Sequence, residues 1–137
     1  MTSGLVVDAS VSAAWLLPDE ATPYTESLLQ ATADREVWVP ALWLLEMGNL
    51  LISAQRRKRI DAAKRRELVM AASALRLRVD REPVSMAAMD EVAASRGLSA
   101  YDAAYLELAI RRSLPMATQD AAMRKAMKAS SVVLAEI

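Results

Sequence analysis

Hydrophobic and polar positions follow two alternating patterns along the chain, short β-branched runs and longer stretches with helical spacing. The short runs predict strands at residues 5–7, 36–40, 115–118 and 131–135, and a strand with a turn within 78–84. Between them, helical spacing predicts helices over 9–17, 22–32, 41–59, 62–77 and 85–97, and further helices that begin at Ser99 and Asp120. Strands separated by helices imply an α/β fold with a mostly parallel central sheet covered on both faces.

Capping residues mark several of these predicted helix ends. Thr22 precedes a proline at the first helical position, and Asp61, Ser85 and Ser99 are good N-caps. Gly97 is placed to stop the helix that Ser85 opens. The helix boundaries are therefore predicted from local chemistry as well as from the apolar spacing.

Length and composition fit one compact domain spanning residues 1–137, since 54% of the side chains are hydrophobic. No apolar run approaches the roughly 18–20 residues that span a bilayer. The N-terminus lacks a basic segment followed by a long apolar one, which a secretory leader needs. Absence of cysteine fits a reducing compartment. We expect a cytoplasmic protein without a membrane segment.

The residue types that are missing exclude several kinds of chemistry. Without histidine or cysteine there is no Ser-His-Asp triad, no imidazole-based ribonuclease site and no His- or thiolate-bound zinc. The three glycines are too scattered for a phosphate-binding loop, and no serine is followed three residues later by lysine. Carboxylates remain as reactive groups, and they favour hard divalent cations, Mg²⁺ or Mn²⁺.

Four acids are candidates for such a site. Asp8 and Asp120 each follow a predicted strand, where ligand sites form in open parallel sheets, whereas Glu46 and Asp102 lie on helices. Each has a structural alternative: Asp8 and Asp120 as N-caps, Asp102 in a capping box with Ser99, and Glu46 facing solvent or paired with an arginine. A metal site would explain all four together, because clustered carboxylates repel one another and a divalent cation reverses that cost.

Three polar side chains near these acids are candidates for supporting roles. Ser10 and Thr118 each lie two residues from a candidate aspartate and could supply hydroxyl groups. Asn49 lies one helical turn after Glu46 on the same face and could orient its carboxylate or bind a metal-bound water. Ordinary turn and capping roles are the alternative for all three.

A run of basic residues ends one predicted helix and begins the next. The net charge is zero, so only the distribution of charge favours a nucleic acid. We expect a phosphate-contacting edge, the alternative being a solvated helical hairpin. The candidate RNA-binding residues are Arg56, Arg57, Lys58, Arg59, Lys64 and Arg65.

The segments "VVDASVSAAWLLPDE", "VPALWLLEMGNLL", "LSAYDAAYLELA" and "MATQDAAMRKA" resemble the four acidic blocks of PIN-domain proteins. Their order and spacing are most similar to the toxins of bacterial and archaeal VapBC-type toxin–antitoxin modules, from Leu5 to the last predicted strand. The resemblance implies a three-layer α/β/α fold and a Mg²⁺- or Mn²⁺-dependent ribonuclease. It further implies a homodimer, inhibition by a cognate VapB-like antitoxin, and an acidic pocket of Asp8, Glu46, Asp102 and Asp120.

Cleavage by such a site would follow from metal chemistry. Metal ions would polarise a phosphodiester and lower the pKa of a bound water, so the products should carry 5′-phosphate and 3′-hydroxyl ends. A phosphoacceptor receiver domain is disfavoured, because Asp8 has no acidic neighbour and no lysine follows the last predicted strand. A catalytically inactive PIN-fold module that binds RNA or protein is the remaining alternative, and metal-dependent cleavage distinguishes the two.

Overall fold

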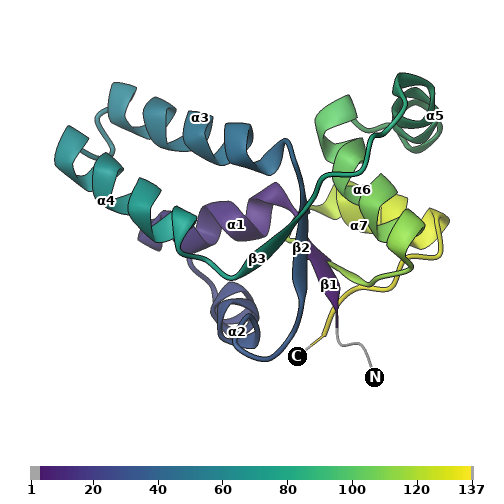
Figure 1. Ribbon diagram of the computed structural model, residues 1–137, viewed down its shortest axis with the longest axis horizontal. Helices are drawn as coiled ribbons and strands as arrows, with labels where there is room; N and C mark the ends of the chain where they lie inside the picture. The colour runs from purple at the N-terminus through teal and green to yellow at the C-terminus, as the bar shows by residue number, and fades with distance from the viewer. Residues whose placement is uncertain (1–3, 137) are drawn as a thin grey trace.

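A computed structural model describes residues 4–136, which form four strands and seven α-helices (Figure 1). Their order is β1 (Leu5–Val7), α1 (Ala9–Leu16), the 3₁₀ turn η1 (Pro18–Glu20), α2 (Pro23–Ala31), β2 (Val37–Pro40), α3 (Trp43–Arg56), α4 (Ala62–Ser73), β3 (Leu77–Asp80), α5 (Met86–Arg96), α6 (Ala100–Arg112), β4 (Met116–Ala117) and α7 (Ala121–Ala129). Among the described residues, none of the helices combines the length and apolar character needed to cross a membrane.

The four strands form one parallel sheet in the order β3-β2-β1-β4. Helices α1 to α4 lie on one side of it and α5 to α7 on the other, so the molecule has three layers (Figure 1). The predicted α/β/α fold with a parallel sheet is therefore confirmed. All four strands point the same way, so the residues that follow them meet at one edge.

The centre of the core is β1. Leu5, Val6 and Val7 are completely buried because helices cover both faces of the sheet. Burial of each such side chain contributes roughly 1.5–3 kcal/mol to folding. The carboxyl group of Asp8 therefore comes directly after a completely buried strand.

The predicted helix caps are present. The Thr22 side chain accepts from the backbone of Thr25, whose hydroxyl accepts in return from the Thr22 backbone. Asp61 and Ser85 accept from the third residue of α4 and α5, respectively. Gly97 ends α5 at φ 66°, a left-handed conformation that glycine adopts without strain.

The predicted helix over 62–77 was wrong in extent, and the predicted strand at 131–135 was wrong in kind. The helix expected over 62–77 ends at Ser73, because the residues from Leu77 onward pair with β2. Within the described residues, 131–135 form no strand, only an isolated bridge between Leu134 and Met116. Ser131 has φ 59°, which breaks extended geometry where the segment leaves α7.

Candidate functional site

Asp8 lies at the carboxyl end of β1, beside β4, where the strand order reverses. Its residue is only 4% exposed, yet both carboxylate oxygens have donors. Ser10 Oγ donates to Oδ1 at 2.6 Å, and Thr118 Oγ1, from the residue after β4, donates to Oδ2. Burial raises the pKa of Asp8, although these hydrogen bonds oppose the shift.

Asp8 is also the N-cap of α1, as the structural alternative predicted, because its Oδ1 accepts from the backbone N–H of Val11 at 3.2 Å. The cap of α1 does not account for the hydrogen bond from Thr118 to Oδ2 of Asp8, because Thr118 follows β4 and lies far from α1 in the sequence. The backbone is held as well: Ser12 Oγ donates to the Asp8 carbonyl, and Trp43 Nε1 donates to Ser12 Oγ at 2.9 Å. The carboxylate is therefore oriented by β1, α1, α3 and β4 together.

Glu46 lies in the first turn of α3 and is half-buried. Its Oε1 accepts a 2.6 Å hydrogen bond from the Tyr105 hydroxyl on α6, and no arginine of the described residues pairs with it. Burial raises the pKa of Glu46; the Tyr105 hydrogen bond opposes this shift, and the charges of Asp102 and Asp8 add to it. The carboxylate thus faces other acids.

Tyr105 is completely buried and was not predicted as a site residue. Burial raises its pKa far above the usual range, and the hydrogen bond to Glu46 and the charges of Glu46, Asp8 and Asp102 add to that shift. Its hydroxyl therefore stays protonated and donates to Glu46. Three carboxylates that act on one hydroxyl share one region of the molecule. Tyr105 lies one helical turn after Asp102, a spacing that could have suggested a shared face.

Asp120 is arranged differently from the other three acids. It is exposed, and its Oδ2 accepts from the backbone N–H of Met123, which makes it the N-cap of α7. Its own backbone N–H donates to Thr118 Oγ1 at 3.0 Å, so it joins the Asp8 network through its main chain. The charges of Asp8 and Asp102 act on the Glu46 carboxylate, and Asp120, like Asp8, caps a helix but is exposed.

The carboxylate oxygens of these acids are the possible ligands for a divalent cation. Carboxylate oxygens are the ligands that Mg²⁺ and Mn²⁺ prefer. Burial raises the pKa values of Asp8 and Glu46, and the charges of Asp102 and Asp8 add to the shift at Glu46. Over residues 4–136, no three His, Cys, Asp or Glu side chains are close enough together to hold a metal ion. The type of donor atom therefore suits a hard cation, whereas the described arrangement does not gather three of these side chains around one.

The predicted supporting residues lie on either side of these acids. Ser10 and Thr118 donate to Asp8, as described above. Asn49 is exposed on α3 and lines a groove of about 410 Å³ that Ser10 and Glu46 also line. Asn49 makes no hydrogen bond to Glu46 among the described contacts.

The predicted basic edge is partly engaged within the protein. Arg59 pairs with Asp19 and Glu20 of η1 at 2.9 and 3.1 Å. Lys64 pairs with Glu67, and Arg65 donates to Gln55. Of the six predicted basic residues, three are exposed and have no side-chain partner among residues 4–136, and they are Arg56, Arg57 and Lys58.

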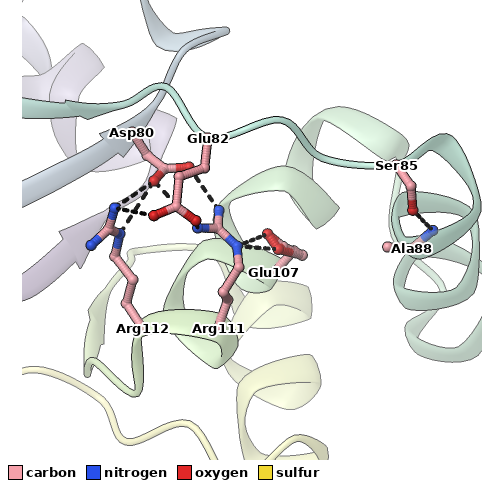
Figure 2. Close-up of polar contacts among 7 residues, drawn as sticks. All are labelled: Asp80, Glu82, Ser85, Ala88, Glu107, Arg111 and Arg112. Atoms are coloured by element: carbon pink, nitrogen blue, oxygen red, sulfur yellow. Dashed lines mark hydrogen bonds and ion pairs between the residues drawn. The ribbon is translucent and has the colours of Figure 1, made fainter.

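A second buried acid, Asp80, ends β3 at the same edge of the sheet and belongs to a separate network. Figure 2 shows its carboxylate between two guanidinium groups, with Arg111 Nη2 at 2.7 Å and Arg112 Nη2 at 2.8 Å. Glu82 bridges the same two arginines, and Glu107 pairs with Arg111. Here the acids are compensated, in contrast to Asp8 and Glu46, so this network is structural.

The chain is similar to known proteins in both sequence and fold. The family described as the PIN domain matches residues 5–129. The solved structure titled "Crystal structure of PAE2754 from Pyrobaculum aerophilum" is similar with a TM-score of 0.66 and 25% sequence identity. That match covers 89% of this chain and 78% of the other. No curated protein matches this chain.

Proposed function

We propose that this chain, which belongs to the PIN-domain family, is a Mg²⁺- or Mn²⁺-dependent endoribonuclease that acts as a VapC-like toxin. PIN domains are generally nucleases and usually bind divalent metal ions. The observation that carries the proposal is the buried carboxylate of Asp8, which has hydroxyl and backbone donors but no cationic partner among residues 4–136. The charges of Asp8 and Asp102 act on the nearby Glu46. Acids at a strand end that lack a cationic partner suit metal-assisted hydrolysis better than they suit stability.

Asp8, Glu46 and Asp102 would hold the metal, and Asp120 is the fourth proposed member. A bound cation would supply Lewis-acid stabilisation of the phosphodiester and a water of lowered pKa. Ser10 and Thr118 keep the Asp8 carboxylate in one orientation through their hydroxyls. Tyr105 occupies one oxygen of Glu46, so the other oxygen is the one offered to a ligand.

The proposed partners are RNA, a cognate VapB-like antitoxin and a second copy of this chain. Large apolar side chains are exposed at the N-terminal ends of three helices, which supports a protein partner at that edge. Leu45 is 78% exposed, Tyr101 66% and Met86 87%.

The function is tested by incubating end-labelled RNA with protein freed of any co-purified antitoxin, in Mg²⁺, Mn²⁺ or EDTA. We expect cleavage only with a divalent cation, giving 5′-phosphate and 3′-hydroxyl ends because water attacks the phosphorus. A 2′,3′-cyclic phosphate as the primary product would contradict this mechanism. Tight RNA binding without cleavage in any metal would favour an inactive binding module.

Tyr105→Phe is expected to weaken metal binding, because Glu46 loses the donor that fixes one of its oxygens. The concentration of Mn²⁺ that gives half of the maximal thermal stabilisation should rise about tenfold, equivalent to about 1.4 kcal/mol. The measurement is the melting temperature as a function of Mn²⁺ concentration.

Tyr24→Phe is the matched control, since its hydroxyl donates to the Ala135 carbonyl and not to a carboxylate. Both variants should lose some stability without metal, but only Tyr105→Phe should shift the Mn²⁺ midpoint. Equal midpoints in the two variants would mean that the Tyr105 hydroxyl supports only the fold.

A further inference from the structure

The groove between α1 and α3 has one acid, Glu46, near one end and one cation, Arg57, at the other. Its α3 side includes Glu46, Asn49, Ser53 and Arg57. These residues are spaced by three or four positions, so they lie along one face of the helix. The α1 side is formed by small residues, Ala9, Ser10 and Ala13. At 1.5 Å per residue, the line from Glu46 to Arg57 is about 16 Å long.

We propose that this groove is the track of the RNA backbone next to the cleaved bond and that Arg57 binds a phosphate at its far end. This proposal rests on the nuclease function and adds the path of the substrate. The cleaved phosphate would lie at the acidic end with the metal, and the neighbouring backbone would pass Asn49 and Ser53. The groove has a volume of about 410 Å³, within the range of small-ligand sites.

Arg57 is distinguished from the other basic residues by its surroundings. Among residues that line the groove, it is the one cation, and its side chain has no ion pair or hydrogen bond within residues 4–136. Arg59 is held by Asp19 and Glu20 instead. Arg56 and Lys58 are exposed but do not line the groove. Of the basic residues predicted from the sequence to bind RNA, the proposal assigns the phosphate contact in this groove to Arg57. The roles of the others stay predictions.

The charges at the two ends of the groove also favour this path for the RNA backbone. Without metal, Glu46 and its acidic neighbours repel a phosphate at one end of the groove. Arg57 attracts the backbone at the other end, and this attraction does not depend on metal. An arginine suits the task because its planar guanidinium binds phosphate oxygens in pairs. RNA could therefore be held in register before the acidic end is neutralised.

The test compares Arg57→Gln with Arg76→Gln, an exposed arginine before β3 that has no side-chain partner among the described residues. Both are made in Asp8→Asn protein, so that RNA stays intact, and binding of a labelled single strand is followed by fluorescence anisotropy at several salt concentrations. Loss of one phosphate contact should reduce the slope of log K against log salt by about 0.7 for Arg57→Gln. Arg76→Gln should leave the slope unchanged.

Steady-state cleavage by otherwise wild-type protein gives a second readout. Arg57→Gln should raise KM several-fold and change kcat little, because the contact is made equally in the ground state and the transition state. A single uncharged methylphosphonate linkage, moved along the RNA, should remove the difference between Arg57→Gln and wild type at one position only. That position measures how far Arg57 lies from the cleaved bond.

The failures of the two proposals are distinguishable. Wild-type cleavage with equal salt slopes and KM values for Arg57→Gln and Arg76→Gln would overturn the groove and leave the nuclease function standing. A difference between Arg57→Gln and wild type that persists with the uncharged linkage at every position would also overturn it. Absence of both binding and metal-dependent cleavage in every protein would overturn the nuclease function, and the groove with it.

Discussion

Replacing Asp8 with asparagine is expected to reduce metal-dependent RNA cleavage by about 10³-fold or more while the protein remains folded. The loss corresponds to about 4 kcal/mol of transition-state stabilisation, since a metal in such a site contributes several kcal/mol. Asparagine keeps one acceptor oxygen for Ser10 and the backbone of Val11, so the cap of α1 survives. The measurement is the single-turnover cleavage rate of labelled RNA with saturating Mn²⁺.

The same substitution should raise the melting temperature of the metal-free protein by a few degrees at pH 7. Because burial raises the pKa of Asp8, its contribution to stability is full below the unfolded pKa and is lost as pH rises through the folded pKa. At pH 7 the ionised carboxylate therefore costs stability, and asparagine removes that cost. The advantage of the variant should shrink as pH falls toward 3.8, the ordinary pKa of the group.

Asp34→Asn is the control, because Asp34 is an exposed acid for which the structure records no side-chain partner. It should cleave RNA at the wild-type rate and melt at the wild-type temperature. Mg²⁺ at a hundred times its dissociation constant should stabilise wild type and Asp34→Asn by about 2.7 kcal/mol. It should stabilise Asp8→Asn much less. If Mg²⁺ and Mn²⁺ leave wild type unshifted, Asp8 is not part of a metal site.

Local chemistry made much of the fold predictable. The buried β-branched run of β1 and the caps at Thr22, Asp61 and Ser85 depend on neighbours within a few residues, and they appear where the sequence predicts them. The segment at 131–135 has the composition of a strand, yet the left-handed turn at Ser131 lets it make only one bridge. Composition alone does not show how much of a neighbouring strand is available for pairing.

The sequence identified four candidate acids, whose shared role in a metal site stays a prediction, but it did not identify their hydrogen-bond partners. Asp8 was identified because a charge after a buried strand needs a reason, but the bond between Glu46 and Tyr105 joins residues 59 positions apart. No periodicity links such a pair, since the contact is set by how α3 and α6 pack across the sheet. The capping role of Asp120 was also weighed from sequence, and the structure shows that cap. Whether Asp120 additionally reaches a metal stays a prediction.

The second large effect is expected at Asp80, on stability. Asp80→Ala should lower the free energy of unfolding by about 3 kcal/mol and the melting temperature by about 10 °C. The side chain of Asp80 is 3% exposed, and its removal leaves two guanidinium groups without their main acceptor (Figure 2). Their own exposure, 29% for Arg111 and 28% for Arg112, allows some rehydration, so the effect falls at the lower end for a broken buried pair.

Glu82→Ala is the matched control, since Glu82 contacts the same two arginines but is 60% exposed. It should cost less than about 1 kcal/mol, as exposed ion pairs do. Equal losses in the two variants would show that burial of Asp80 is not the cause. Chemical denaturation at neutral pH measures both free energies of unfolding.

The pH dependence of stability separates the two acidic networks. Burial tends to raise the pKa of Asp80, but hydrogen bonds from Arg111 and Arg112 outweigh it, so the pKa lies below its ordinary value of 3.8. Its contribution to stability is therefore present above pH 3.8 and is lost as pH falls through the folded pKa. Asp8 affects stability with the opposite sign. Lowering the pH should therefore reduce both the stability advantage of Asp8→Asn over wild type and the stability deficit of Asp80→Ala. Because Asp80 holds the C-terminal end of α6, the helix that carries Asp102 and Tyr105, Asp80→Ala should also lower the temperature at which cleavage is lost.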